Sequence, residues 1–184
     1  MSKPGPWASF PDRFAGFDRQ VDAWWERLRG NNVVDRVFYA ASEAGDFGLI
    51  WMAIGATEAA FGPHRKAVSL VRLAAALGAE SVIVNAGLKS LFRRERPSWY
   101  QDRPHGLRKP RTSSFPSGHA SSAVTAVILL TEGGTPFGVL YGALAAVVAT
   151  SRVHVKIHHA SDVVGGLVVG AILGSAIRRL APVS

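Results

Sequence analysis

Three separated segments of the chain carry side chains that could act on a phosphate group. The segments are KSLFRRERP (Lys89–Pro97), PSGH (Pro116–His119) and SRVHVKIHHASD (Ser151–Asp162). Together they combine fixed cations, a candidate helix N-terminus and two histidines, and they border apolar stretches long enough to lie in a bilayer. This combination predicts hydrolysis of a phosphate ester that is carried on a lipid.

The first segment places basic residues at spacings that could share one face of a helix. Lys89 and Arg93 are four residues apart, and Arg96 follows three residues later. Pro97 disfavours helical geometry at the residue before it, so the helix is expected to end near Arg96. Two or three cations would then point to one locus at a membrane boundary, although such a row alone is more typical of a topology anchor.

The second segment has the composition of a helix start. Ser117, Gly118 and His119 are expected in the first turn, because Ser and Pro precede them and an apolar stretch begins at His119. Unpaired backbone N–H groups in a first turn favour a bound phosphate, and Gly118 leaves room for an oxyanion near the backbone. The same residue types also form ordinary turns, so this segment is weak evidence by itself.

The third segment is the most specific. Arg152 ends an apolar stretch, and His158 and Asp162 stand four residues apart at the start of the next. On a helix the carboxylate could hold one imidazole nitrogen and leave the lone pair of the other free to attack phosphorus. An isolated pair of this kind is usually a surface or capping interaction. The sequence assigns no role to His154 or His159.

The composition indicates a membrane protein. Of 184 residues, 48% are hydrophobic and 18% charged, and the net charge is +8; long apolar stretches between the basic residues argue against a nucleic-acid binder. The absence of cysteine excludes disulfides and thiolate metal sites. We expect an all-α bundle with about five spanning helices in a domain over residues 46–184, from the apolar segments Asp46–Gly62, Ala67–Phe92, His119–Thr131, Pro136–Ser151 and Ala160–Ile177.

The expected domain at residues 1–45 carries an amphipathic helix with Phe17, Val21, Trp24, Trp25 and Leu28 on one side. It is predicted to lie in the headgroup layer, or alternatively to pack on a protein partner. Small residues at four-residue spacing predict close helix packing in the last two apolar segments: Gly138, Gly142 and Ala146, then Gly166, Gly170 and Gly174. Chance spacing in a Gly-rich chain is the alternative.

Two connections differ in character. The long polar connection from Arg93 to Pro116 is expected to be functional, with disorder in its middle, Gln101–Arg111, as the competing interpretation. The sequence TEGGTP (Thr131–Pro136) predicts a tight turn.

In their order, Lys-x6-Arg-Pro, Pro-Ser-Gly-His and Ser-Arg-x5-His-x3-Asp resemble the signature of the type 2 phosphatidic acid phosphatase (PAP2) superfamily of membrane lipid phosphatases. The resemblance runs from about Asp46 to Ile177. Two features depart from the family: His159 stands where an aromatic residue is common, and an amphipathic stretch replaces the first of six spanning helices. Neither departure removes a catalytic group.

The resemblance implies a role for each matched residue. Lys89, Arg96 and Arg152 would bind the phosphate oxygens, helped by Ser117 and the backbone N–H of Gly118. His158 would form a phosphohistidine, Asp162 would orient it, and His119 would protonate the leaving oxygen and then activate water. Fixed cations would replace the metal ions of other phosphatases. The implied enzyme is metal-independent and has no cofactor.

Alternatives stay open at this level. A metal site from His119, His154, His158 and Asp162 is disfavoured, because Lys89, Arg96 and Arg152 would repel a divalent cation. A non-catalytic lipid-headgroup binder or transporter would explain the basic rims but not the pairing of His158 with Asp162. Oligomeric state is not determined.

Within the family, a polyprenyl phosphate, diphosphate or phosphosugar is the expected substrate, with phosphatidic acid or phosphatidylglycerophosphate as the alternative. The basic loop Arg103–Arg111 could admit a diphosphate or phosphosugar. The resemblance implies a multi-pass protein of the cell membrane with an extracytoplasmic active site. Charge bias favours the opposite orientation, because the far side carries only Arg65, Lys66, Arg178 and Arg179.

Overall fold

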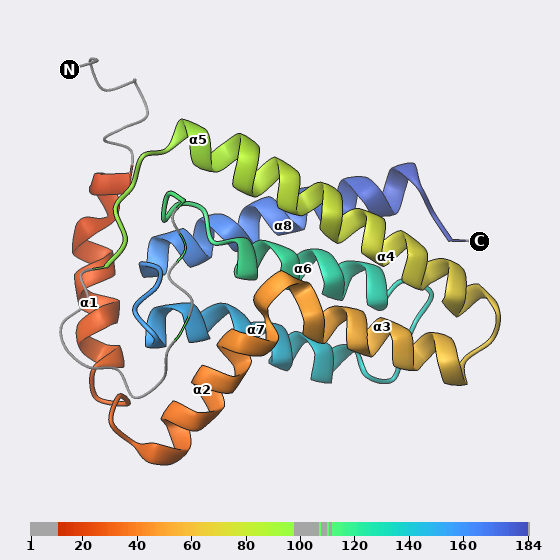
Figure 1. The fold of residues 1–184 in the computed structure, drawn as a ribbon, viewed down its shortest axis with the longest axis horizontal. Helices are drawn as coiled ribbons and strands as arrows, with labels where there is room; N and C mark the ends of the chain where they lie inside the picture. Colours follow the sequence, from red (N-terminus) through yellow and green to blue (C-terminus); the bar gives the residue numbers. More distant parts are fainter. Residues whose placement is uncertain (1–10, 98–106, 108–109, 111, 184) are drawn as a thin grey trace.

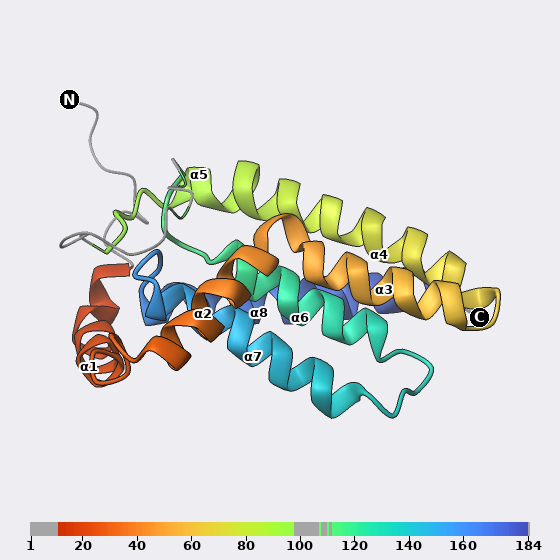
Figure 2. The same cartoon turned by 60° about the horizontal axis from the view of Figure 1, so that its bottom comes forward.

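In a computed structural model, the chain forms a bundle of helices with one further helix lying across its end (Figure 1; Figure 2). The structure describes residues 11–97, 107, 110 and 112–183. The helices are α1 (Ala15–Trp25), α2 (Asn32–Ala44), α3 (Leu49–Phe61), α4 (Arg65–Ser81), α5 (Lys89–Leu91), α6 (Gly118–Leu130), α7 (Gly138–His154) and α8 (Ala160–Leu180). Short 3₁₀ turns cover Pro11–Phe14 and Asp46–Gly48, and a π-helical segment, Val82–Leu88, joins α4 to α5.

Two helices are long and apolar enough to cross a membrane. The first is the continuous helix Arg65–Leu91, made of α4, the π-helical segment and α5, and the second is α8. Helices α3 and α6 have 13 residues each and α7 has 17. At 1.5 Å per residue, 13 residues cover about 20 Å of a hydrocarbon core of about 30 Å. The all-α prediction is confirmed, and two of the five predicted segments reach full spanning length.

Glycines bring α8 against α6, as the sequence predicts. A methyl group at Gly166 or Gly170 would lie 2.3 Å from the backbone oxygen of Ser117 or Ser121, so only glycine permits the contact. The prediction that Gly142 of α7 brings this helix close to another helix of the same chain is wrong, because a methyl group at Gly142 would meet nothing within 4 Å. Helix α7 instead packs through its other face, with Tyr141, Ala145, Val148 and Ala149 buried.

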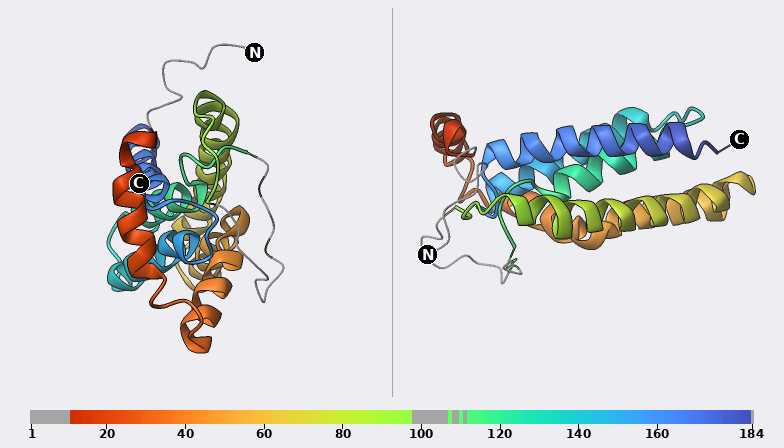
Figure 3. Two further views of the ribbon diagram at one scale, coloured as in Figure 1. Left: turned by 90° about the vertical axis from the view of Figure 1, so that its left-hand side faces the viewer. Right: turned by 90° about the horizontal axis from the view of Figure 1, so that it is seen from above.

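Helix α1 lies crosswise at the end of the bundle where α8 begins (Figure 3). Its predicted apolar face divides in two. Val21 and Trp25 pack against a cluster that contains Val153 of α7, whereas Phe17 and Trp24 are 45% and 52% exposed. The N-terminal helix is therefore attached to the bundle of its own chain and also presents aromatic side chains outward.

Polar side chains of the apolar helices pair within the bundle. Glu58 accepts from Lys66 Nζ and from the Tyr141 hydroxyl, both at 2.7 Å, and Arg72 pairs with Glu132. Large apolar side chains point outward from the long helices, among them Val71, Val82, Val139, Val168 and Ile172. Charges inside and apolar groups outside are the arrangement that a lipid environment favours. Gly133 and Gly134 adopt positive φ in the predicted turn between α6 and α7.

Candidate active site

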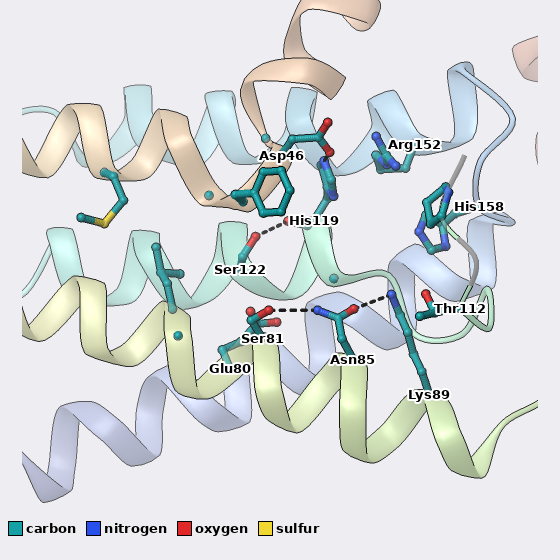
Figure 4. Close-up of a pocket in the computed structure, with 18 of the residues that line it drawn as sticks. Asp46, Glu80, Ser81, Asn85, Lys89, Thr112, His119, Ser122, Arg152 and His158 are labelled. Carbon is teal, nitrogen blue, oxygen red and sulfur yellow. Dashed lines mark hydrogen bonds and ion pairs between the residues drawn. The ribbon is translucent and has the colours of Figure 1, made fainter. Parts of the chain in front are cut away.

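The three motifs meet at the end of the bundle beside α1, around a cavity of about 660 Å³ (Figure 4). The end of α5, the start of α6, the end of α7 and the start of α8 all lie at this end (Figure 1). Six of the residues singled out from the sequence line the cavity: Lys89, Arg96, Gly118, His119, Arg152 and His158. The other two, Ser117 and Asp162, have no exposed surface.

His158 lies in the turn before α8, one residue ahead of the helix N-cap His159. The prediction of a helical i,i+4 pair is therefore wrong in detail, but the pairing occurs: His158 Nδ1 is 3.5 Å from Asp162 Oδ2. On the other side of the ring, Nε2 is 3.3 Å from Arg96 Nη1. Burial lowers the pKa of His158 to about 3, so the imidazole is neutral at physiological pH.

The Asp162 carboxylate is held by several donors. Arg94 Nη1 donates to its Oδ1 at 2.5 Å, and Oδ2 accepts from Ser114 Oγ at 2.5 Å and from the backbone N–H of His159 at 2.8 Å. The first turn of α8 thus caps itself with the carboxylate that faces His158. These three hydrogen bonds fix the Asp162 carboxylate in one orientation.

Arg94 is a site residue that the sequence analysis missed. Its Nη2 donates to Asp18 Oδ2 of α1 at 2.6 Å, and Asp18 Oδ1 accepts from the backbone N–H of Ser161 at 2.8 Å. One arginine therefore joins α1 to the carboxylate beside His158. The sequence offers two adjacent arginines, and no signal in it chooses Arg94 over Arg93.

The predicted helix end near Arg96 is wrong, because the helix stops at Leu91 and Phe92 is extended. Tertiary contacts outweigh the local helical preference there. Phe92 packs edge-on against Phe115 at 4.9 Å, and the backbone of Arg94 pairs with Ser113 Oγ and the Ser114 N–H. Arg93 is exposed and does not line the cavity beside Lys89.

Three cations converge on the cavity. Lys89 Nζ donates to Asn85 Oδ1 at 2.7 Å, Arg96 Nη1 donates to the carbonyl of Ile157 at 2.9 Å, and Arg152 donates to Ser42 Oγ. Within the described part of the chain none of the three cations forms a salt bridge. Neutral partners hold their positions. The three cations outnumber the two acidic side chains that line the cavity, Asp46 and Glu80, which favours an anion there.

His119, in the first turn of α6, faces the same cavity from another side (Figure 4). Its Nε2 lies 3.2 Å from Asp46 Oδ1 and 3.1 Å from the carbonyl of Ser42. A methyl group at Gly45 would lie 2.6 Å from His119 Cδ2, so glycine is needed there. Sequence spacing could not find Ser42, Gly45 or Asp46, because they come from the segment between α2 and α3.

The start of α6 is organised as the sequence predicts. Ser117 is the N-cap, and its side chain accepts from Ala120 N. A methyl group at Gly118 would lie 3.6 Å from Asn85 Oδ1 and 3.9 Å from Lys89 Nζ. The Gly118 backbone therefore faces Lys89 without an intervening side chain, which leaves the helix N-terminus open to an oxyanion.

His154 belongs to a separate contact. Its Nδ1 accepts from Trp25 Nε1 at 2.9 Å, its Nε2 lies 2.8 Å from Asp35 Oδ1, and its ring stacks on Phe38 at 4.7 Å. It attaches α1 and α2 to the end of α7. The described residues contain no group of three or more His, Cys, Asp or Glu side chains that could hold a metal ion, so the four-ligand metal site considered from the sequence does not form there.

Most of the loop Arg103–Arg111, and most of the segment for which disorder was the competing interpretation, lies outside the described residues. Of its described positions, Leu107 packs against the cluster of Tyr39, Val155 and Ile157, and Pro110 lines the cavity. The connection thus reaches the site at Pro110.

Comparisons with known proteins agree with this arrangement. A model of the PAP2 superfamily matches residues 69–183. The chain is 32% identical over 140 residues to the decaprenylphosphoryl-5-phosphoribose phosphatase of Mycobacterium tuberculosis (strain CDC 1551 / Oshkosh), covering 74% of each protein. It is 35% identical over 131 residues to the phosphatase of the same name from Mycolicibacterium smegmatis, covering 69% of this chain and 68% of the relative.

Two solved structures share the fold. The transmembrane PAP2-type phosphatidylglycerolphosphate phosphatase of Bacillus subtilis superposes with a TM-score of 0.69 at 22% identity, covering 91% of this chain and 85% of that one. Aquifex aeolicus LpxE superposes with a TM-score of 0.70 at 22% identity, covering 87% and 93%. The bundle is therefore the fold of transmembrane PAP2 proteins.

Proposed function

The chain belongs to the PAP2 superfamily and is a membrane lipid phosphatase, and from this premise we propose that it hydrolyses the phosphate ester of a polyprenyl-linked phosphosugar through a phosphohistidine. The two relatives described above are decaprenylphosphoryl-5-phosphoribose phosphatases. Their likeness supports a polyprenyl phosphosugar over a polyprenyl diphosphate, and either of these over phosphatidic acid or phosphatidylglycerophosphate.

The observation that carries the proposed mechanism is the placement of His158 between the Asp162 carboxylate and the cations that line the cavity. With Nδ1–H directed at Asp162, the Nε2 lone pair faces the position where Arg96 would hold a phosphate. Nε2 forms a bond to phosphorus as the bond from phosphorus to the ester oxygen breaks. His119 gives its proton to that oxygen.

The second step reverses the proton transfer. His119 takes a proton from water, the resulting oxygen bonds to phosphorus, and the bond from phosphorus to His158 breaks, which releases inorganic phosphate. Lys89, Arg96 and Arg152, with Ser117 and the backbone N–H of Gly118, would stabilise the charge on the equatorial oxygens in both steps. In this mechanism the cations serve in place of a metal ion.

For the membrane arrangement, we propose five spanning segments in a domain over residues 46–184, with residues 1–45 at the membrane surface beside the site. The exposed Phe17 and Trp24 of α1 support an interfacial position. An extracytoplasmic active site follows from the family resemblance. Because the chain has no cysteine, labelling of Glu95→Cys near the site and of His64→Cys at the opposite end by an impermeant reagent tests the orientation.

Phosphate release by purified protein tests the function. The panel compares polyprenyl phosphoryl-5-phosphoribose, polyprenyl diphosphate, phosphatidic acid and phosphatidylglycerophosphate, with His158→Ala as the blank. We expect the fastest turnover with the phosphosugar and none with the variant. Equal release by His158→Ala would refute the mechanism, and binding without any release would favour a lipid-headgroup binder or transporter.

A further inference from the structure

The cavity continues beyond the cations along α4, toward the middle of the bundle. Lys89 lines it at the end where the motifs meet. Four residues line it at successive positions toward the N-terminus of α4: Ser81, Glu80, Leu77 and Ala74. Glu80 lies nine residues before Lys89, or about 13 Å along a helix axis. The cavity is therefore cationic at one end, polar in its middle and apolar at its far end.

A ladder of hydrogen bonds connects the cationic end to the polar middle (Figure 4). Lys89 Nζ donates to Asn85 Oδ1 at 2.7 Å, and Asn85 Nδ2 donates to Ser81 Oγ at 3.1 Å. Asn85 lies in the π-helical segment, a type of helix distortion that is frequent at functional sites. Two hydrogen bonds therefore lead from the phosphate-binding lysine to the residue beside Glu80.

Glu80 itself has no use in the mechanism and is costly to bury. Glu80 is only 3% exposed, and its Oε1 has no hydrogen-bond partner among the described residues. Ser122 of α6 lines the same part of the cavity from the facing helix (Figure 4). Ser121 of α6 lies close to this carboxyl group. A buried oxygen without a hydrogen bond still destabilises a fold, so a ligand that supplies the missing bond to Oε1 is a physical reason to retain Glu80.

We propose that Glu80, with Ser81 and Ser122, forms a subsite for the hydroxyl groups of the sugar that carries the hydrolysed phosphate. The inference rests on the proposed function and adds to it the part of the enzyme that selects the headgroup. With the terminal phosphate at Lys89, the sugar occupies the polar middle of the cavity. The phosphodiester on the other side of the sugar then lies beyond Glu80, and the polyprenyl chain leaves along the apolar end beside Leu77 and Ala74.

The chemistry of Glu80 explains why this subsite prefers a sugar. A carboxylate accepts hydrogen bonds from hydroxyl groups, and vicinal hydroxyls can use both of its oxygens. In a polyprenyl diphosphate the second phosphate directly follows the first. It would place its negative charge near the Glu80 carboxylate in a poorly solvated cavity, where like charges repel strongly. Phosphatidic acid carries no hydroxyl for the subsite to bind.

The test compares two substrates on one set of variants. The kcat/KM of phosphate release is measured with polyprenyl phosphoryl-5-phosphoribose and with polyprenyl diphosphate, for the native protein, Glu80→Gln and Glu80→Ala. We expect the phosphosugar value to fall by about 10-fold to 100-fold, as for loss of a hydrogen bond to a charged group. The diphosphate value should stay unchanged or rise, so the ratio of the two substrates falls.

Glu58→Gln is the matched control, because it removes a carboxylate of another apolar helix that is paired with Lys66 and Tyr141 and does not line the cavity. We expect it to leave the substrate ratio unchanged. Thermal unfolding of each variant shows whether the fold is retained. If Glu80→Ala does not fold, the comparison uses Glu80→Gln, which keeps the shape of the side chain.

Each remaining outcome is decisive. Equal losses on both substrates in Glu80→Gln would overturn the subsite and leave Glu80 with a role in helix packing only. A native protein that releases phosphate from the diphosphate but not from the phosphosugar would also overturn it. Absence of release from every substrate would refute the proposed function itself, which is a different result from an unchanged ratio.

Discussion

Replacement of Gly166 by alanine tests whether the contact between α8 and α6 sets the geometry of the active site. The new methyl group would lie 2.3 Å from the backbone oxygen of Ser117 and 2.9 Å from Ala120 Cβ. Ordinary contacts of a Cβ atom begin at 3.4 Å. Because a backbone oxygen cannot rotate away, the start of α8 must move from α6 by about 1 Å, against close packing.

That movement reaches the catalytic groups directly. Asp162 lies one turn before Gly166, and its carbonyl accepts from the backbone N–H of Ser117 at 2.9 Å. Misplacement of reacting groups by 1 Å can lower a rate by on the order of 100-fold, and overpacking destabilises a fold by about 1–3 kcal/mol. We therefore expect Gly166→Ala to lose about 100-fold in kcat with a lower unfolding temperature.

Gly142→Ala provides the comparison, since its methyl group would meet nothing within 4 Å. Its phosphate release should stay within about twofold of the native rate, as for a substitution without contacts. Both variants are assayed as purified proteins below their unfolding temperatures. If Gly166→Ala turned over as fast as Gly142→Ala, the packing of α8 on α6 would not control the site, and the reasoning would be wrong.

Further expectations concern charge, pH and metal. Arg94→Met should destabilise the protein by about 3–5 kcal/mol, because Asp162 and Asp18 stay buried without their cation. Adding Asp18→Asn to this variant should restore part of the lost stability. If it restored none, the pairing of Arg94 with Asp18 would not be the source of the loss. In the unfolded chain the imidazole of His158 has a pKa near 6.5, whereas burial lowers it to about 3 in the folded protein. Between these two pH values the unfolded chain binds a proton that the folded protein does not. The free energy of unfolding should therefore fall as the pH drops from about 6.5 toward 3, by up to about 1.4 kcal/mol per pH unit. His158→Ala should reduce that slope in thermal unfolding, and an unchanged slope would rule out this origin. Dialysis against a chelator should leave phosphate release unchanged, whereas a loss restored by added divalent metal would refute metal independence.

The sequence by itself determined the helical membrane class and the groups that gather at the cavity. Apolar stretches report their environment through composition, because lipid accepts few charged side chains. Lys89, His119, Arg152 and His158 were found because each stands at a fixed distance along the chain from other members of a motif. Such spacing is preserved whether or not the segments touch.

Only the tertiary structure decided which neighbours hold these groups. Arg94, rather than Arg93, meets Asp162 and Asp18 because the chain leaves its helix at Leu91 and turns beside Phe115. The contacts of His119 with Ser42 and Asp46 join segments more than 70 residues apart. Glycine spacing indicates that two helices approach closely, but it does not say which side chains of distant segments meet, because those contacts depend on how whole helices pack.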